Sequence, residues 1–272
     1  MNTLEKNAPN WSRDEIIKEL KIFKDIYKRR PIKDNLHGMR FPHMFATYFL
    51  LKKIKPSYVI ESGIYRGQST WLIEETLPNA KILSIDIDLS NRKYISEKVN
   101  YSNIDFKHQD LSNIPEDTLV FFDDHVNHYQ RLMQAKFFNI KNIIFEDNYN
   151  IDKGDFYTLK HVENYNGFNH NYSKKSLIKT FYIFFIEILK KFILKKYYID
   201  NDKILFRLRD HIPNKNDFFN IRKNIEIYYE FPPIINNENT DKKPILEDIN
   251  FELEVTKEDL SGYNNITYLK LF

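Results

Sequence analysis

The chain has 272 residues, of which 42% are hydrophobic and 15% aromatic, so it can build a substantial core. Its 41 basic and 38 acidic residues leave a formal charge of only +3, which argues against a dedicated nucleic-acid binder, and no nucleic-acid partner is expected. The absence of cysteine excludes disulfides, a thiol nucleophile and a cysteine-based zinc site. Residues 1–13 are polar and offer no signal peptide, so the expected location is cytoplasmic.

The first part of the chain, residues 1–55, is expected to form helices and a loop that covers the substrate or the cofactor. Ser12 is followed by two acids and then by apolar residues at helical spacing, which predicts a capped helix that ends near Arg30. A polar loop and a second helix over 42–53 follow, and Pro56 ends this part.

Residues 56–150 alternate between short apolar runs and helical segments. This alternation is typical of a mostly parallel sheet with helices on both faces. We predict strands at Tyr58–Glu61, Lys81–Asp86, Ile104–His108, Thr118–Phe122 and Asn142–Phe145, with helices at Gly67–Leu77, Asn91–Val99 and Tyr129–Phe138.

The pattern changes after residue 150. Residues 151–224 are predicted to be a helical insertion, and its 156–198 region could form a lid, a homo-oligomer surface or part of the core. The apolar stretch 176–194 is interrupted by four charged residues, so no transmembrane span is expected. Residues 225–272 hold two further strands, at Ile225–Phe231 and Asn265–Phe272, which are expected to complete the sheet with an antiparallel edge. The predicted fold class is therefore α/β, Rossmann-like and doubly wound, with seven strands.

Two of the apolar runs end in acids, in the segments Leu119-Val-Phe-Phe-Asp-Asp-His125 and Ile143-Ile-Phe-Glu-Asp-Asn148. Parallel neighbouring strands present their carboxyl ends at one edge of a sheet, where ligands bind in open α/β folds. Carboxylate and amide oxygens suit a hard cation such as Mg²⁺. The alternative for any single acid is a helix cap or a solvated loop.

The first predicted strand runs into a helix through two glycines, Gly63 and Gly67. The first lets the backbone turn tightly beside a ligand, and the second lets the helix begin close to the strand. The spacing matches neither the three-glycine dinucleotide pattern nor a phosphate-binding P-loop. A turn punctuated by glycine, with no ligand, is the alternative.

The next two predicted strands also end in polar residues. Asp86 stands where an acid can accept hydrogen bonds from both ribose hydroxyls, with Asp88 as its rival and a helix cap as the alternative role. The segment Gln109-Asp110 could contact an adenine edge. A ligand that contains adenosine would account for all three strand ends together.

These motifs together resemble a class I S-adenosylmethionine-dependent methyltransferase. The segment Glu61-Ser-Gly-Ile-Tyr-Arg-Gly-Gln-Ser69 is similar to the glycine loop of catechol O-methyltransferase, and Phe122-Asp-Asp-His125 and Glu146-Asp-Asn148 resemble its two metal-ligand segments. The resemblance is closest to the cephalosporin hydroxylase-like and rhamnosyl O-methyltransferase group. It covers about residues 35–160 and the segment Glu226–Pro233.

The resemblance implies S-adenosylmethionine and Mg²⁺, or another divalent cation, as cofactors. The implied cofactor contacts are Glu61, Gly63, Tyr65, Gly67 and Ser69 for the methionine part, Asp86 for the ribose, Gln109 or Asp110 for the adenine, and His125 beside the cofactor. The implied metal ligands are Asp124, Asp147 and either Glu146 or Asn148, with Asp123 as a second candidate on the fourth strand.

The chain departs from the catechol enzymes at the general base. Those enzymes place a lysine three residues after the ligand on the fourth strand, where this chain has Asn127. His128 or His125 could take the proton instead, because histidine titrates near neutral pH. Activation of the acceptor at a metal held by Asp124 could also make a strong base unnecessary.

The expected reaction is methyl transfer to the oxygen of a small hydroxyl acceptor. By analogy with the group it resembles, the acceptor would be a sugar or a nucleotide-linked precursor of a surface glycan such as a capsule, and a phosphoramidate group is another option. Two other classes stay open. One is a different metal-dependent enzyme on the same scaffold, such as a hydroxylase partner or a hydrolase. The other is a cofactor-binding module without chemistry.

Overall fold

The computed structural model describes residues 3–150, 153–154, 156–164, 216–246, 255, 257–260 and 262–272. The apolar stretch 176–194, most of the predicted 151–224 insertion and most of the predicted 156–198 contact surface lie outside these residues. Among the helices that are described, none is both long enough and apolar enough to cross a membrane.

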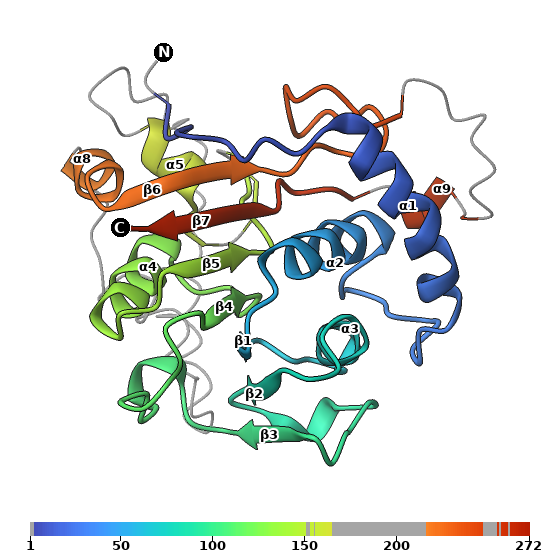
Figure 1. The fold of residues 1–272 in the computed structure, drawn as a ribbon, viewed down its shortest axis with the longest axis horizontal. Coiled ribbons are helices and arrows are strands. Elements are labelled where there is room, and N and C mark those ends of the chain that lie inside the picture. Colours follow the sequence, from blue (N-terminus) through green and yellow to red (C-terminus); the bar gives the residue numbers. More distant parts are fainter. Residues whose placement is uncertain are drawn as a thin grey trace, which may run out of the picture.

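Seven strands form one sheet in the order β3-β2-β1-β4-β5-β7-β6 (Figure 1). Strands β1 to β5 are parallel, whereas β7 is antiparallel to both of its neighbours and lies one position inside the edge strand β6. This topology confirms the predicted fold class. The strands are β1 Tyr58–Ser62, β2 Lys81–Ile85, β3 Val99–Ser102, β4 Leu119–Phe122, β5 Asn142–Phe145, β6 Ile225–Glu230 and β7 Thr267–Leu271.

The strand order reverses between β1 and β4, which are neighbours in the sheet. Ligands of open α/β folds bind in the crevice outside the carboxyl ends of the strands at such a switch point. The glycine turn follows β1, and the first pair of acids follows β4. The topology therefore brings the two motifs that the sequence singled out to one place.

Helices cover both faces of the sheet (Figure 1). Side chains of β4 alternate between two cores: Leu119 and Phe121 pack with α1, α2 and α3, whereas Val120 and Phe122 pack with α4 and α5. A strand buried on both sides reads as an unbroken apolar run, as β4 does. The helices are α1 Arg13–Lys28, α2 Phe41–Ile54, α3 Gln68–Thr76, α4 His128–Phe137, α5 Leu159–Asn164, α8 Asn216–Arg222 and α9 Lys257–Leu260.

The segment between β2 and β3 differs from the sequence prediction. A helix was expected over 91–99, but only the 3₁₀ turn η1, Leu89–Asn91, forms there. The amides of Lys93 and Tyr94 donate to the carbonyl of Arg66, at 2.9 and 3.0 Å, so they are not available for a helix. This contact holds the segment against the glycine turn.

The third strand is also displaced from its predicted position. It occupies Val99–Ser102 rather than 104–108, and the later residues form the 3₁₀ turn η2, Phe106–His108. The apolar pattern was misleading because Ile104 is 52% exposed. Asp105 instead caps η2 through the amide of Lys107.

Candidate functional site at the ends of β4 and β5

The register between β4 and β5 decides which acids meet. Phe122 pairs with Phe145, and the amide of Glu146 donates to the carbonyl of Phe122 at 3.0 Å. Asp123 and Glu146 are therefore the first residues after the ends of β4 and β5, on neighbouring strands. Because successive residues of a strand point to opposite faces, Asp124 turns away from Asp123.

On one side, Asp123, Glu146 and Asp147 form what we call the acid cluster. Carboxylate oxygens of Asp123 and Asp147 lie within 4.8 Å of each other, and so do those of Glu146 and Asp147. Burial raises the pKa of Asp123 well above its usual value, and the charges of Glu146 and Asp147 raise it further. Burial and the charge of Asp147 likewise raise the pKa of Glu146. Carboxylates that repel one another in this way, with oxygen donors facing one space, fit a hard divalent cation.

On the other side, Asp124 belongs to what we call the arginine cluster, with Arg131 and Asp105. The Arg131 guanidinium, only 1% exposed, lies 2.8 Å from Asp124 Oδ2 and bonds both oxygens of Asp105, at 3.0 and 2.8 Å. Ser62 also donates to Asp124, at 2.6 Å. Asp124 is thus already neutralised by a cation of the chain. The pleat turns Asp124 towards α4, so the geometry favours Asp123 as the β4 metal ligand, and the expectation of Asp124 stays a prediction.

A histidine that the sequence analysis did not select joins the acid cluster. His43, in the first turn of α2, is 4% exposed, and its Nδ1 contacts Glu146 Oε1. Its Nε2 accepts the backbone N–H of Asn264 at 3.0 Å. Burial lowers the pKa of His43, although the charge of Asp147 opposes this, so the neutral imidazole does not cancel the charge of the cluster.

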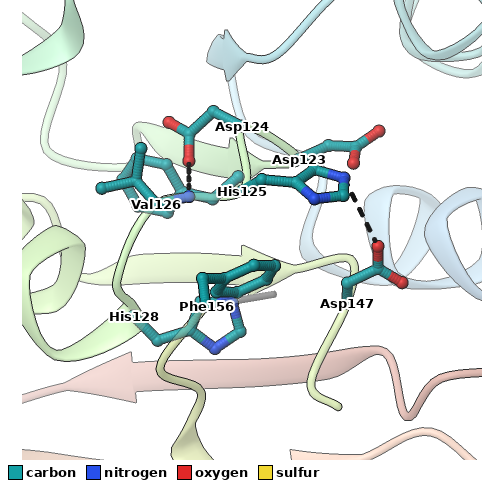
Figure 2. Close-up of a pocket in the computed structure, with 8 residues that line it drawn as sticks. Asp123, Asp124, His125, Val126, His128, Asp147 and Phe156 are labelled. Carbon is teal, nitrogen blue, oxygen red and sulfur yellow. Dashed lines mark hydrogen bonds and ion pairs between the residues drawn. The ribbon is translucent and has the colours of Figure 1, made fainter. Parts of the chain in front are cut away.

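A small cleft opens between the two acid-ended strands. Figure 2 shows the His125 imidazole pointing across it to Asp147, and the two groups are 3.8 Å apart. The cleft is narrow and holds little free room in this structure. Its lining residues are Phe122, Asp123, Asp124, His125, Val126, His128, Asp147 and Phe156.

His128 forms one wall of this cleft and is 3% exposed. Its ring stacks on Phe145, with ring centroids 3.9 Å apart, and Nδ1 has no hydrogen-bond partner among the described residues. Burial lowers the pKa of His128 well below its usual value, and the nearby His161 and His125 lower it further. The imidazole is therefore neutral near pH 7, with an unsatisfied nitrogen.

The glycine turn is held by its neighbours on both sides. A Cβ on Gly63, whose φ is +99°, would come within 2.1 Å of the carbonyl oxygen of Asp123, so only glycine lets β1 and β4 approach this closely. Asp86 Oδ2 accepts the amides of Ile64 and Tyr65, at 2.9 and 3.0 Å. Its rival Asp88 instead caps the turn η1 through the amide of Ser90.

Gly67 and Tyr65 extend this arrangement. A Cβ on Gly67 would meet the carbonyl oxygen of Tyr94 at 2.8 Å, which explains the second glycine by chain packing alone. Tyr65 donates through its hydroxyl to the carbonyl of Leu36, at 3.1 Å. The 34–38 loop therefore lies against the glycine turn, where a covering loop was predicted.

Glu61 and Ser69 lie deeper than their predicted roles suggested. Glu61 is fully buried and accepts the hydroxyls of Thr70 and Ser84, at 2.6 and 2.5 Å. Burial raises the pKa of Glu61, while these hydroxyls partly oppose the shift. Ser69, in the first turn of α3, is 3% exposed. Both residues brace the glycine turn from behind.

The two predicted adenine contacts have structural partners. Gln109 donates to Ser102 Oγ at 2.8 Å, and the exposed Asp110 accepts the hydroxyl of Ser112 at 2.7 Å. Both follow the η2 turn rather than the end of β3, because that strand ends at Ser102.

Asn148 and Asn127 are also engaged. Asn148 is fully buried: its amide donates to Tyr228 and Thr267, and its oxygen accepts the amide of Lys160. It takes no part in either acid group, so Glu146 rather than Asn148 joins Asp147. Asn127 is the N-cap of α4, accepting the amide of Gln130 at 3.1 Å.

Sequence reasoning missed His43 and Arg131, although each left a signal. His43 lies in a helical segment in which residues 41–51 are all buried, and a buried polar side chain needs a partner. Arg131 lies one helical turn after Asn127, on the face of α4 that carries Leu132 and Ala135 into the core. A buried arginine needs a carboxylate partner, and here Asp105 and Asp124, both partly buried, supply two.

No protein-family model and no curated protein matches the chain. Among solved structures, CmcI with Mg and S-adenosylmethionine is similar over 53% of this chain and 69% of its own, with 16% identity and a TM-score of 0.33. The methyltransferase PaMTH1 of Podospora anserina, bound to S-adenosylhomocysteine, is similar over 52% and 65%, with 16% identity and a TM-score of 0.36. The plantazolicin methyltransferase BpumL is similar over 52% and 63%, with 18% identity and a TM-score of 0.33. Likenesses of this size carry no argument about activity, and the fold assignment rests on the strand order and directions.

Proposed function

We propose that the chain is an S-adenosylmethionine-dependent O-methyltransferase that uses a divalent cation, Mg²⁺ in the first place. The observation that carries this proposal is the position of the acid cluster. It lies at the carboxyl ends of β4 and β5, directly beside the glycine turn that ends β1 at the topological switch point. A cofactor site beside a cation site would place the methyl donor next to an acceptor hydroxyl that the cation activates.

The cofactor would bind along the glycine turn. Asp86 is the proposed ribose acceptor, because its carboxylate stands at the end of β2 and already accepts two amides of the turn. Tyr65 and the backbone at Gly63 are proposed to contact the methionine part, with Glu61, Gly67 and Ser69 supporting the turn. Gln109 and Asp110 are retained as proposed adenine contacts. His125, the exposed histidine opposite Asp147, is proposed to lie beside the cofactor.

Asp123, Glu146 and Asp147 are the proposed metal ligands. A bound cation would lower the pKa of an acceptor hydroxyl and fix its direction. Asp147 is held in place for this role, since Tyr149 and Asn264 donate to its two oxygens at 2.7 and 3.0 Å.

His128 is the proposed general base. It is neutral, it faces the cleft, and its Nδ1 has no partner among the described residues, so it can accept the proton of an acceptor hydroxyl. The stack on Phe145 fixes the plane of the ring. The position three residues after the β4 ligand is Val126 for Asp123 and Asn127, the cap of α4, for Asp124, so neither candidate is followed by a lysine there.

The cleft has little free room in this structure, so the acceptor is proposed from the family resemblance and not from the shape of the site. A sugar or nucleotide-linked surface-glycan precursor, as in capsule synthesis, is the proposed acceptor, with a phosphoramidate group as a further option. A cytoplasmic location and a homo-oligomer that uses residues 156–198 belong to the same proposal.

The alternative functions differ in what they bind. A hydrolase or hydroxylase-associated enzyme on this scaffold would bind the metal but not S-adenosylmethionine. A cofactor-binding module would bind S-adenosylmethionine without metal-dependent turnover, and the absence of a lysine at both Val126 and Asn127 is the observation that favours it.

Calorimetric titration with S-adenosylmethionine and S-adenosylhomocysteine, with and without Mg²⁺, tests the proposal. We expect both ligands to bind the wild-type protein. The variant Asp147→Ala should bind S-adenosylmethionine within several-fold of wild type and lose all Mg²⁺-dependent methyl transfer to sugar-nucleotide acceptors. Asp88→Ala is the matched control, because it removes an exposed acid near the same turn that caps η1 and lies outside the acid cluster. If neither ligand binds, the methyltransferase assignment is wrong.

A further inference from the structure

His43 connects three parts of the chain at the back of the acid cluster. It lies on α2, its Nδ1 contacts Glu146 after β5, and its Nε2 contacts the backbone of Asn264 before β7. The ring is also held by Tyr263, edge to face, with ring centroids 5.6 Å apart. A buried side chain with a partner for each ring nitrogen has one defined orientation.

The hydrogen bonds of His43 fix which nitrogen carries the proton. A backbone N–H can only donate, so Nε2, which receives the amide of Asn264 at 3.0 Å, must be unprotonated. In a neutral imidazole the proton is then on Nδ1, which faces Glu146 Oε1. A protonated nitrogen has no lone pair to offer a cation. Although His43, Glu146 and Asp147 lie within metal-ligand distance of one another, His43 in this tautomer cannot be a ligand.

Asn264 supports the neighbouring carboxylate in the same way. Its side chain donates to Asp147 Oδ1 at 3.0 Å, and its carbonyl accepts the amide of Asn148 at 2.9 Å. The same residue therefore aligns His43 through its backbone and Asp147 through its side chain. Glu146 and Asp147 are held from behind by a continuous chain of hydrogen bonds.

We propose that His43 is a positioning residue: its Nδ1–H orients Glu146 as an oxygen ligand, and Asn264 locks the tautomer that makes this possible. The inference rests on the metal site of the proposed function. Partners behind metal ligands typically change metal affinity by 10–100-fold when they are removed. The proposal also predicts that the cation contacts oxygen, and not the His43 nitrogen, on this side of the site.

Two substitutions separate the two hydrogen bonds of His43. His43→Asn places an amide nitrogen near the position of Nδ1, so it can still donate to Glu146 while losing the contact with Asn264. His43→Gln reaches the position of Nε2 instead, so it can still accept the Asn264 amide while losing the donor to Glu146. His43→Ala removes both.

Mn²⁺ binding, followed by electron paramagnetic resonance of the protein without S-adenosylmethionine, is the test. We expect the Mn²⁺ dissociation constant to rise about 10–100-fold in His43→Ala and His43→Gln, and to stay within about 3-fold of wild type in His43→Asn. Circular dichroism should show all three variants folded. Equal weakening in the asparagine and alanine variants would overturn the role of the Nδ1–H donor.

Pulsed measurements on bound Mn²⁺ address direct ligation. A directly bound imidazole gives a ¹⁴N coupling. We expect the ¹⁴N signal of wild type to be unchanged in His43→Asn. A wild-type ¹⁴N coupling that is lost in all three His43 variants, including His43→Asn, would make His43 a ligand and overturn the proposal. If wild type binds Mn²⁺ but not S-adenosylmethionine, the proposed activity fails while the inference stands. If wild type binds no Mn²⁺, the inference fails even where S-adenosylmethionine binds.

Discussion

The two sides of the β4 end treat buried charge in opposite ways. In the arginine cluster, Asp105 and Asp124 share a guanidinium that is almost fully buried. In the acid cluster, the charges of Glu146 and Asp147 raise the pKa of Asp123, and among the described residues only the cation of His125 lowers it. Asp123 and Asp124 are adjacent in the chain, yet one is neutralised by the protein and the other is not.

This difference distinguishes a structural group from a binding group. A carboxylate paired with a buried arginine holds its loop in place, because breaking the pair leaves an uncompensated charge in the interior. A carboxylate that faces other carboxylates is costly unless a cation joins it. A bound cation would therefore stabilise the carboxylates of the acid cluster, whereas Arg131 already compensates those of the arginine cluster.

The largest effect should follow from removing the arginine. Arg131→Met leaves Asp105 and Asp124 without their cation, and should lower the free energy of unfolding by about 3–5 kcal/mol, measured by urea denaturation. Lys141→Met is the control: this lysine is 3.7 Å from Glu116, whose side chain is 84% exposed, and the loss should be about 0–1 kcal/mol. A similar small loss for both variants would mean that the arginine cluster is not a structural anchor.

A smaller effect is expected at the glycine that lets the two strand ends meet. Gly63→Ala would drive its Cβ against the Asp123 carbonyl and impose a strained φ, so it should cost about 1–3 kcal/mol and weaken Mn²⁺ binding by displacing Asp123. Gly262 also has a positive φ, of +78°, but a Cβ there would meet nothing within 4 Å. Gly262→Ala should therefore cost less and leave Mn²⁺ binding unchanged. Equal effects of the two variants on Mn²⁺ affinity would contradict the link between Gly63 and the acid cluster.

The smallest effect concerns pH and has opposite signs in the two clusters. Because the folded-state pKa values of Asp123 and Glu146 are raised, their contribution to stability is complete below the unfolded values and is lost as pH rises through the raised values. Burial alone would raise the pKa of Asp105, but Arg131 outweighs it and lowers that pKa. The contribution of Asp105 is therefore present above its unfolded pKa and is lost as pH falls.

Urea titrations of the metal-free protein at several pH values should resolve this difference. Asp123→Asn should raise the free energy of unfolding near pH 7 on the order of 1 kcal/mol, and the gain should shrink towards pH 4. Asp105→Asn should instead lower it near pH 7, with the loss shrinking as pH falls. With saturating Mg²⁺, the free energy of unfolding of Asp123→Asn should fall below that of wild type. An Asp123→Asn variant that is less stable than wild type at pH 7 without metal would show that the acid cluster carries no repulsion.

The two clusters also show which parts of the site could be predicted from the sequence. The apolar run of β4, followed by acids, predicted a strand end at a ligand-binding edge, and the sheet topology agrees. The sequence does not separate Asp123 from Asp124 as the metal ligand, because adjacent acids give the same signal, and only the register with β5 places Asp123 beside Glu146. The predicted position of the third strand was wrong because Ile104 and Phe106 alternate with polar residues as in a strand. The structure instead places Asp105 against Arg131 of α4.

By itself, the sequence determined the alternating α/β architecture, the glycine turn after β1 and the two strand ends that carry acids, because periodicity and turn chemistry are local properties. The tertiary structure alone decided that Asp123 faces Glu146, that Arg131 neutralises Asp124 and that His43 reaches the site from α2. Each of these depends on strand register or on contacts between residues far apart in the chain. Burial then sets the cost of every unpaired charge, and burial exists only once the layers have packed.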